Sequence, residues 1–345
     1  MGRLQVLATI QDVAKKAGVA PITVSRVINN SGYVSKGVRE SVLEAIAALG
    51  YVPNTLARSL RSRQTNTLAL VLTDITNPFF TTVARGVEDA ASDAGFMVIV
   101  CNTDECEDEE QKYLRMLLEK RVDGILLVPV RQGVESIRTI QAQGASVVVL
   151  DRRAPQGSAD VVRCDSEDGA FQLGRLLVSL GHRRVAILSG PEGVSTTDDR
   201  VAGCRRALAE DGVQRDLAVY HGGFTQDSGC DMTYRALTAV PRPTALFASN
   251  NFIGIGALKA LRDLGLRSPD DVAIVGFDDL PPALVTFPFL TVASQPAYEM
   301  GRQAVELLLE RLRGNAPEAF QEIVLPTELI IRQSSGDPLV TGPSK

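Results

Sequence analysis

The segment TIQDVAKKAGVAPITVSRVIN, residues 9–29, decides the fold of the amino-terminal part of the chain. In its first half, apolar residues recur at intervals of three and four, as on one face of an amphipathic helix: Ile10, Val13, Ala14 and Ala17. Thr9 is placed to cap this helix and Gly18 to end it. Pro21 favours the start of a second helix, because its missing N–H would have no partner in a first helical turn. Two short helices joined by a tight, glycine-containing turn predict a helix-turn-helix.

The second helix of this segment buries aliphatic side chains and leaves its other face free. The free face carries five side chains that are able to reach base edges in a DNA major groove: Ile22, Thr23, Ser25, Arg26 and Asn29. Arginine suits guanine, asparagine suits adenine, and aliphatic carbon suits the thymine methyl group. Residues 35–50 predict a third helix, so an ordinary three-helix bundle with a polar outer face is the alternative interpretation.

The charge of the chain is divided unevenly. Residues 1–63 hold nine basic and three acidic residues, a net charge of +6, whereas the rest of the chain has a net charge of −11. A basic end on an acidic body indicates a nucleic-acid-binding head on a domain that avoids nucleic acid. A merely solvated basic surface is the other interpretation.

Residues 51–66, with the sequence YVPNTLARSLRSRQTN, are expected to form a linker. Asn54 is placed to cap a short helix with Leu56 and Leu60 on one face and Arg58 and Arg61 beside them. A helix of about two turns is too short to be stable alone. We therefore expect it to order only when something supports it, and DNA is the obvious support.

From residue 67 the pattern becomes an alternation of short apolar runs and helical segments. Runs of this kind are typical of parallel strands covered on both faces. The expected strands are Leu68–Leu72, Phe96–Val100, Gly124–Val128, Ser146–Leu150, Val185–Leu188, Ala245–Phe247 and Val272–Val275, with weaker ones near 161–164, 217–220 and 321–331. The expected helices include 80–94, 108–121, 167–180, 199–211 and 251–264. So many strands exceed one small sheet, and we predict two doubly wound parallel-sheet subdomains that meet near residues 160–165.

Composition bounds the class of protein. With 45% apolar and 22% charged residues, the chain is typical of a soluble globular protein. No run of 18 apolar residues is present and no secretory signal is visible, so we expect neither a membrane span nor export. The five cysteines form no C-x-x-C pair, which disfavours a disulfide framework or a zinc site. A reducing cytoplasm is the expected location.

Sequence patterns for catalysis are missing. His182 and His221 belong to no metal-binding pattern, and neither a phosphate-binding P-loop nor a nucleophile elbow is found. Gly254 and Gly256 lack the third glycine of a dinucleotide fingerprint and lie inside a helical pattern, which favours close helix packing. We therefore expect no catalytic residue, no metal and no cofactor.

Polar residues gather just past the carboxyl ends of the expected strands, where open α/β sheets bind ligands. They are Asp74, Asn77, Asp151, Arg152, Thr196, Arg200, Asn250, Asn251, Asp278 and Asp279. Such side chains offer paired donors and acceptors to a polyhydroxylated molecule. Phe79 and Phe80 are placed to supply an apolar wall for a sugar ring or a base. The alternative is that these polar residues only cap the helices that follow.

Several of these motifs together resemble the lactose-repressor/galactose-repressor (LacI/GalR) family of bacterial transcription regulators. The matching segments are Thr9–Ala14, Ala17–Val19, Thr23–Val27, Gly50–Asn54, Ala57–Leu60, Ile75–Phe80, Arg121–Gly124 and Gly276–Asp279. The resemblance covers about residues 8–333. It implies an all-α helix-turn-helix head at 1–52, a hinge helix and linker at 53–66, and a periplasmic-binding-protein-like core at 67–345. In that core the chain is expected to cross back between subdomains near 291–296 and 322–327.

The resemblance further implies a homodimer that reads a pseudo-palindromic operator in double-stranded DNA. The implied DNA-binding residues are Thr9, Ile22, Thr23, Ser25, Arg26, Asn29, Ser35, Tyr51, Asn54, Ala57, Arg58, Leu60 and Arg61. Among them Leu60 matches a leucine that is wedged into a minor-groove step and kinks the duplex. No leucine heptad follows residue 333, so the tetramer of some relatives is not expected.

A small-molecule effector, a sugar or sugar derivative, is expected between the two subdomains. The implied effector-binding residues are Phe79, Phe80, Asp151, Thr196, Arg200, Phe247, Asn250 and Asp278. Closure of the subdomains on the effector would order or melt the hinge helix and so change operator affinity. A solute-binding protein and an enzyme on the same fold are the alternatives. The missing signal sequence and the DNA-binding head argue against the first, and the missing catalytic pattern argues against the second.

Some positions depart from the family pattern. Ala20 replaces a usual capping serine, Ile22 replaces a frequently small or polar base-reading residue, and Asn251 stands where many sugar-binding members have aspartate. The pair Arg152–Arg153 is compatible with an acidic ligand or with ordinary surface charge.

Overall fold

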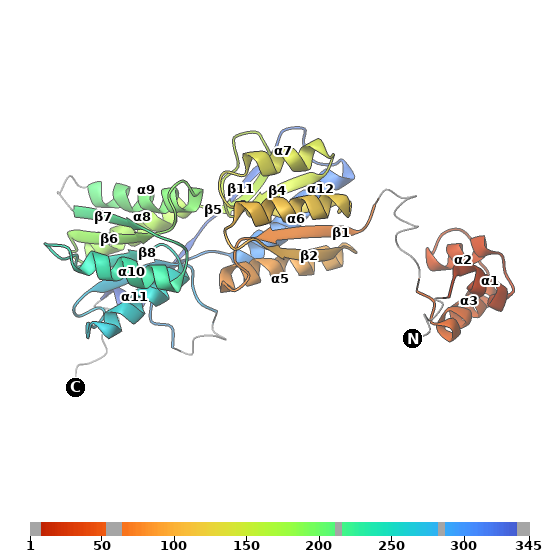
Figure 1. The fold of residues 1–345 in the computed structure, drawn as a ribbon, viewed down its shortest axis with the longest axis horizontal. Helices are drawn as coiled ribbons and strands as arrows, with labels where there is room; N and C mark the ends of the chain where they lie inside the picture. Colours follow the sequence, from red (N-terminus) through yellow and green to blue (C-terminus); the bar gives the residue numbers. More distant parts are fainter. Residues whose placement is uncertain (1–7, 53–63, 211–215, 282–286, 337–345) are drawn as a thin grey trace. The chain divides into compact units, whose positions relative to one another are not determined.

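The computed structural model describes residues 8–52, 64–210, 216–281 and 287–336. Contacts within the chain divide it into two units, Met1–Thr65 and Asn66–Lys345. The first unit is helical and the second is built from strands and helices in alternation (Figure 1). The predicted combination of an all-α head and an α/β body is confirmed.

The head is a bundle of three short helices with its own apolar core. Its helices are α1 (Ile10–Ala17), α2 (Pro21–Ile28) and α3 (Lys36–Leu49), and Val13, Val24 and Val42 are fully buried between them. Thr9 and Asp12 form a reciprocal capping box at the start of α1. Gly18 ends the helix with φ 67°, a left-handed conformation that glycine adopts without a steric penalty.

The body contains two six-stranded sheets. The first has the order β11-β5-β4-β3-β1-β2 and is parallel throughout. Its strands are β1 (Thr67–Leu72), β2 (Met97–Asn102), β3 (Gly124–Leu127), β4 (Ser146–Leu150), β5 (Asp160–Cys164) and β11 (Glu322–Leu325). The second has the order β12-β10-β9-β8-β6-β7, and only the edge pair of β10 and β12 is antiparallel. Its strands are β6 (Arg184–Ser189), β7 (Asp216–His221), β8 (Ala245–Ala248), β9 (Ala273–Phe277), β10 (Thr291–Ser294) and β12 (Glu328–Ile330).

Helices cover both faces of each sheet, as a doubly wound fold requires. The first sheet has α5 (Pro78–Asp93) and α12 (Ala297–Arg313) on one face and α6 (Glu107–Glu119) and α7 (Val134–Ala142) on the other. The second sheet has α8 (Ser166–Ser179) and α9 (Ser195–Ala209) on one face and α10 (Gln226–Leu237) and α11 (Asn251–Asp263) on the other. A short 3₁₀ turn, η1 (Gln333–Ser335), follows β12.

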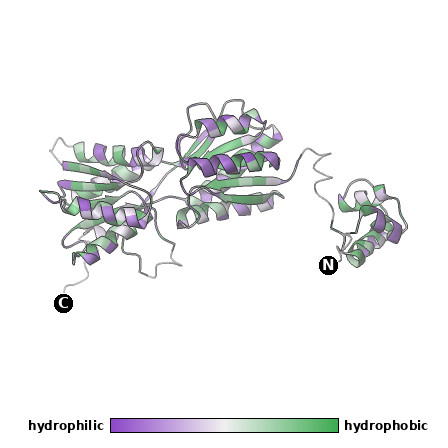
Figure 2. Ribbon diagram, viewed as in Figure 1, coloured by the Kyte–Doolittle hydropathy of each residue, from purple (hydrophilic) through white to green (hydrophobic). Residues whose placement is uncertain are grey.

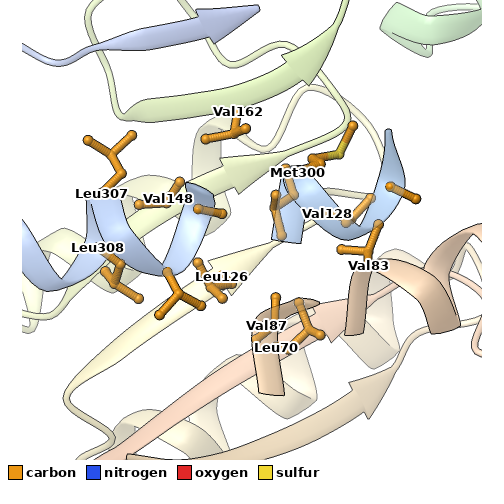
Figure 3. Close-up of a cluster of buried hydrophobic side chains, with 14 of the residues drawn as sticks. Leu70, Val83, Val87, Leu126, Val128, Val148, Val162, Met300, Leu307 and Leu308 are labelled. Carbon is orange, nitrogen blue, oxygen red and sulfur yellow. The ribbon is translucent and has the colours of Figure 1, made fainter. Parts of the chain in front are cut away.

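The apolar residues lie where these layers meet. The strands are predominantly hydrophobic, whereas the helices carry hydrophilic residues on their outer faces (Figure 2). In the first sheet, Val83 and Val87 of α5 and Met300 and Leu308 of α12 pack against the strands, with Leu70 among them (Figure 3). Most of the short apolar runs are therefore strands buried on both faces, as predicted. The run at 96–100 is the exception, because β2 is an edge strand in which Met97 is 64% and Val100 is 42% exposed.

The chain passes between the two sheets three times. It leaves the first sheet after β5, returns from β10 to α12, and passes again from β11 to β12. We call the first sheet with its four helices the first lobe, and the second sheet with its four helices the second lobe. Each lobe therefore combines residues from both ends of the body.

Two glycines, Gly229 of α10 and Gly256 of α11, allow these two helices of the second lobe to pack closely. A Cβ atom on Gly256 of α11 would lie 2.0 Å from the carbonyl oxygen of Gln226 in α10, and one on Gly229 would lie 2.4 Å from that of Ile253. The two helices are thus in backbone contact. The interpretation as close helix packing is confirmed for Gly256, whereas a Cβ atom on Gly254 would make only ordinary contacts, 3.4 Å from Leu290 and 3.6 Å from Ala248.

Candidate functional site

The outer face of α2 is open to solvent in the head. Ile22 is 56% exposed, Arg26 and Asn29 are exposed, and Thr23 and Ser25 are half-buried. The Asn29 side-chain amide donates to the Ser25 carbonyl oxygen at 2.8 Å and to the Ser25 hydroxyl at 3.2 Å. As expected from Ala20, the first turn of α2 has no side-chain cap. The major groove of B-DNA admits an α-helix, so side chains on the open face of α2 are able to reach base edges.

The other head residues expected at DNA take several positions. Thr9 is exposed, and the hydrogen bonds that its hydroxyl and backbone N–H donate to the Asp12 carboxylate lower the pKa of that group. Ser35 is exposed at the start of α3, and Tyr51 is half-buried against the head core. The remaining expected contacts lie outside the described residues: Asn54, Ala57, Arg58, Leu60 and Arg61.

A cavity of about 360 Å³ lies between the two lobes of the body, at the carboxyl ends of their strands. Both lobes line it, through loops that are far apart in the sequence. Its lining residues are Thr73, Asp74, Thr76, Asn77, Phe79, Phe80, Asp104, Glu105, Asp151, Arg152, Pro191, Thr196, Arg200, Gly223, Phe224, Thr225, Asn250, Asp278 and Gln295. This volume falls in the range of small-molecule sites.

Arg200 of α9 is a buried charged group of the cavity, only 3% exposed. Its guanidinium donates to the Ser249 carbonyl oxygen at 2.6 Å and lies 4.0 Å from the centre of the Phe277 ring. Arg200 also attracts the carboxylates of Asp151 and Asp278. The arginine is thereby held in one orientation, with its charge inside the cavity.

The two buried carboxyl groups have perturbed pKa values. Burial raises the pKa of Asp151 to about 6, although Arg200 and Arg152 partly oppose the shift. Burial also raises the pKa of Asp278, against the attraction of Arg200 and a 2.6 Å hydrogen bond from the Gln295 amide. Neighbouring groups with raised pKa values in a cavity are typical of a functional site.

Both aspartates are also held in a left-handed backbone conformation. The φ angle is 64° at Asp151 and 67° at Asp278, and the Arg152 N–H donates to the Leu150 carbonyl oxygen at 2.6 Å, closing a tight turn around Asp151. A residue other than glycine is strained in this region, and such strain concentrates at functional sites.

One amide contact joins the lobes directly beside the cavity. The side-chain oxygen of Asn77 caps α5 by accepting from the Phe79 N–H at 3.0 Å. The same oxygen accepts from the Asn251 side-chain amide of the second lobe at 2.9 Å. An aspartate at 251 would present no donor at neutral pH, so this departure from the family pattern creates the contact.

Phe79 and Phe80 pack edge to face, with 5.0 Å between their ring centres, and form the apolar wall of the cavity.

Seven of the eight expected effector-binding residues line the cavity, and one does not. Phe247 is fully buried in the core of the second lobe, packed with residues such as Val275 and Leu173. It lies within β8, before the end of the strand, and points toward the layer of α8 and α9. The expectation for Phe247 is therefore wrong.

Other lining residues were not expected. Phe224 and Gln295 follow β7 and β10 and so obey the same rule as the expected residues, but the sequence signal of both strands was weak or unrecognised. Asp104 and Glu105 follow β2 in a tight turn.

Arg152 is 2% exposed and lines the cavity, so the interpretation of this residue as ordinary surface charge is wrong.

Several buried polar atoms in the cavity have no hydrogen-bond partner among the described residues. They are Asp151 Oδ1, Arg152 Nε, Arg200 Nε and Gln295 Oε1. Buried polar atoms are normally paired, so a mixed set of open donors and acceptors fits a ligand with several hydroxyl groups. Within the described parts of the chain, no cluster of three His, Cys, Asp or Glu residues is arranged to hold a metal ion, and no helix is long and apolar enough to cross a membrane.

A helix-turn-helix head joined to a two-lobed ligand cleft defines a class of protein, the DNA-binding regulator that responds to a small molecule. Residues 9–54 match the bacterial regulatory proteins of the lacI family, and residues 65–332 match the periplasmic binding proteins and sugar binding domain of the LacI family. The chain therefore belongs to the LacI family of bacterial regulators.

Known proteins similar to this chain support the same assignment. It is 35% identical over 337 residues to the HTH-type transcriptional regulator DegA of Bacillus subtilis, covering 96% of this chain and 99% of that protein. It is 36% identical over 329 residues to the ribose operon repressor of Halalkalibacterium halodurans, covering 95% and 97%. A lac repressor dimer bound to operator and the anti-inducer ONPF superposes with a TM-score of 0.85 at 28% identity, covering 95% of this chain and 99% of that one.

Proposed function

We propose that this chain is a cytoplasmic repressor, not an enzyme, whose operator affinity is controlled by a sugar bound between the lobes. The observation that carries the proposal is the cavity itself. Both lobes contribute buried polar atoms that have no described hydrogen-bond partner, and Phe79 and Phe80 form an aromatic wall. A sugar offers hydroxyl groups to the former and an apolar ring face to the latter. The name of the ribose operon repressor favours a monosaccharide of pentose size as the first candidate.

Particular residues are proposed for each contact. Asp151, Arg200, Asn250 and Asp278 would hydrogen-bond the hydroxyl groups, and Phe79 would contact the ring face. Carboxylates and a guanidinium bind vicinal hydroxyls in pairs, which sets the orientation of the sugar. Because both lobes supply these groups, ligand binding favours the closed arrangement.

In the head, we propose that α2 lies in the major groove of a pseudo-palindromic operator and that two copies of the chain bind together. Arg26 and Asn29 would contact base edges, with Thr23 and Ser25 beside them. Ser35 and Tyr51 would contact phosphates. The linker residues Asn54, Ala57, Arg58, Leu60 and Arg61 would order on DNA and couple the head to the closure of the lobes.

Operator binding can be measured by fluorescence anisotropy over a range of salt concentrations, with and without sugar. A repressor that contacts many phosphates loses affinity steeply as salt rises. Arg26→Ala should lower the ratio of specific to non-specific affinity by about five- to 150-fold, since one bidentate base contact contributes about 1–3 kcal/mol of discrimination. Lys16→Ala, which removes the same charge from α1, is the matched control. An unchanged ratio in Arg26→Ala would contradict the proposed reading helix.

The effector class can be tested by thermal unfolding of the full chain with D-ribose, D-xylose, D-glucose, cellobiose and hypoxanthine. A sugar that binds the native state raises the unfolding temperature and alters operator affinity. Stabilisation without any change in operator affinity would instead indicate a solute-binding protein. Stabilisation by hypoxanthine alone would contradict the proposal that the effector is a sugar.

A further inference from the structure

A tight turn in the first lobe brings an acidic side chain into the cavity. The Cys106 N–H donates to the Thr103 carbonyl oxygen at 2.9 Å, and the two central residues, Asp104 and Glu105, have φ angles of 51° and 55°. A turn with two positive φ angles favours glycine or asparagine, because L side chains are strained there. Glutamate at such a position indicates that its side chain has a specific use.

The turn is fixed to the strands beside it. The Asn102 side-chain amide donates to the Asp104 carboxylate at 2.6 Å, and the Thr103 N–H donates to the Leu72 carbonyl oxygen at 2.9 Å. Glu105 is therefore presented from a rigid support. Its carboxylate accepts a hydrogen bond of 2.5 Å from the guanidinium of Arg152, and its side chain is 28% exposed.

Arg152 is almost completely engaged by the first lobe. Its NH1 atom donates to the carbonyl oxygens of Pro129 and Val130 at 2.7 and 2.5 Å, and its NH2 atom donates to Glu105. The Val130 N–H donates in turn to the buried carboxylate of Glu110 at 2.7 Å. Only Nε of Arg152 has no partner among the described residues. Of the five N–H groups of Arg152, only the one on Nε and one on NH2 are left without a described bond, and the charge of the guanidinium is compensated by Glu105.

The remaining charges of the cavity leave no surplus of positive charge. Arg200 is the second arginine of the lining, and it stands against Asp151 and Asp278. Asp74 and Asp104 add carboxylates to the same lining. Arg153, the other member of the arginine pair, is half-exposed and forms an ion pair with Asp199 at 2.9 Å. An acidic ligand would therefore enter a cavity in which each arginine already has an acidic partner.

We propose that Glu105 is a specificity-determining residue, which cancels the charge of Arg152 so that the cavity selects uncharged sugars and rejects sugar acids and sugar phosphates. The inference rests on the proposed function, because it assumes that the cavity binds a sugar. An anionic ligand is repelled by the carboxylates of the lining, and this repulsion is stronger than in water because the effective dielectric constant inside the protein is lower.

The inference is tested with Glu105→Gln, which keeps the size of the side chain and an oxygen for Arg152 but removes the negative charge. Affinities of the full chain are measured by calorimetry for matched pairs: D-glucose with D-glucuronate, D-galactose with D-galacturonate, and D-ribose with D-ribose 5-phosphate. We expect the wild type to prefer a neutral member, and Glu105→Gln to reduce the ratio of neutral to anionic affinity by about tenfold or more. Glu105→Asp, which restores the charge, should recover most of the preference.

Glu107→Gln is the matched control, because it removes the same charge two residues away, from a side chain that pairs with Arg131 and does not line the cavity. It should leave the ratio unchanged. An equal ratio in Glu105→Gln and wild type overturns the inference, as does an equal change in Glu105→Gln and Glu107→Gln. A wild type that prefers the anionic members overturns it while leaving the sugar effector in place. A wild type that binds hypoxanthine and none of the sugars overturns both proposals.

Discussion

The buried carboxyl group of Asp151 should make the stability of the body depend on pH in a direction opposite to that of an ordinary ion pair. Its pKa rises from 3.8 to about 6 because burial penalises the charged form. Each unit corresponds to about 1.4 kcal/mol, so ionised Asp151 costs the folded state about 3 kcal/mol. Below about pH 3, well under the unfolded value of 3.8, the group is protonated in both folded and unfolded chains, and this cost is absent. It develops as pH rises from about 3 to above 6.

Asp151→Asn removes the ionisation and with it the pH-dependent cost. The free energy of unfolding in urea, followed by circular dichroism, is compared between variant and wild type at pH 4.5 and pH 8. About 1 kcal/mol of the cost is already present at pH 4.5, so the difference in favour of the variant should be larger at pH 8 by about 2 kcal/mol. Asp231→Asn, at an exposed position of α10, is the control and should show no such change. The same difference at both pH values for Asp151→Asn would refute the reasoning.

Three further substitutions separate the roles of the other elements. Gly256→Ala forces α10 and α11 apart and should lower the free energy of urea unfolding by about 1–3 kcal/mol. Gly254→Ala is the control and should cause no such loss, because the new methyl group would lie 3.4 Å from its nearest neighbour. Equal losses in the two variants would contradict the packing argument. Arg200→Met should abolish the thermal stabilisation by sugar, and an undiminished shift would remove Arg200 from the ligand site. Leu60→Ala, in the linker, should reduce the bending of operator DNA seen by gel mobility, because a smaller side chain unstacks the bases less; a normally bent complex would exclude the wedge.

Much of the fold could be predicted because local signals and tertiary structure agree. In the head, the cap at Thr9 and the apolar spacing of α1 specify the same helix that the core requires. In the body, the runs that form β1, β3 and β4 are buried on both faces, so hydrophobicity alone marks them. β10, with the sequence Thr291–Ser294, is short and partly polar, and its strand form depends on pairing with β9 and β12.

The candidate site could be predicted where it follows from topology. Residues just past parallel strands converge on one edge of a sheet, which is why Asp151, Asn250 and Asp278 were found. The prediction for Phe247 was wrong because the sequence places this residue near the end of a strand but does not show in which direction its side chain points. Glu105 could not be found, since its position depends on a turn whose backbone disfavours glutamate and on an arginine 47 residues away.

Because the body crosses between its sheets three times, neither lobe can be cut out as a fragment. A polypeptide that stopped before α12 would lack the Met300 and Leu308 side chains that pack on the first sheet, and it would also lack β11. In the second lobe β12 would be lost, and β10 would keep only its pairing with β9. During synthesis the three helices of the head emerge complete with their core, while the sensor must wait for the last part of the chain. The order of assembly therefore places the DNA-reading surface ahead of the switch that controls it.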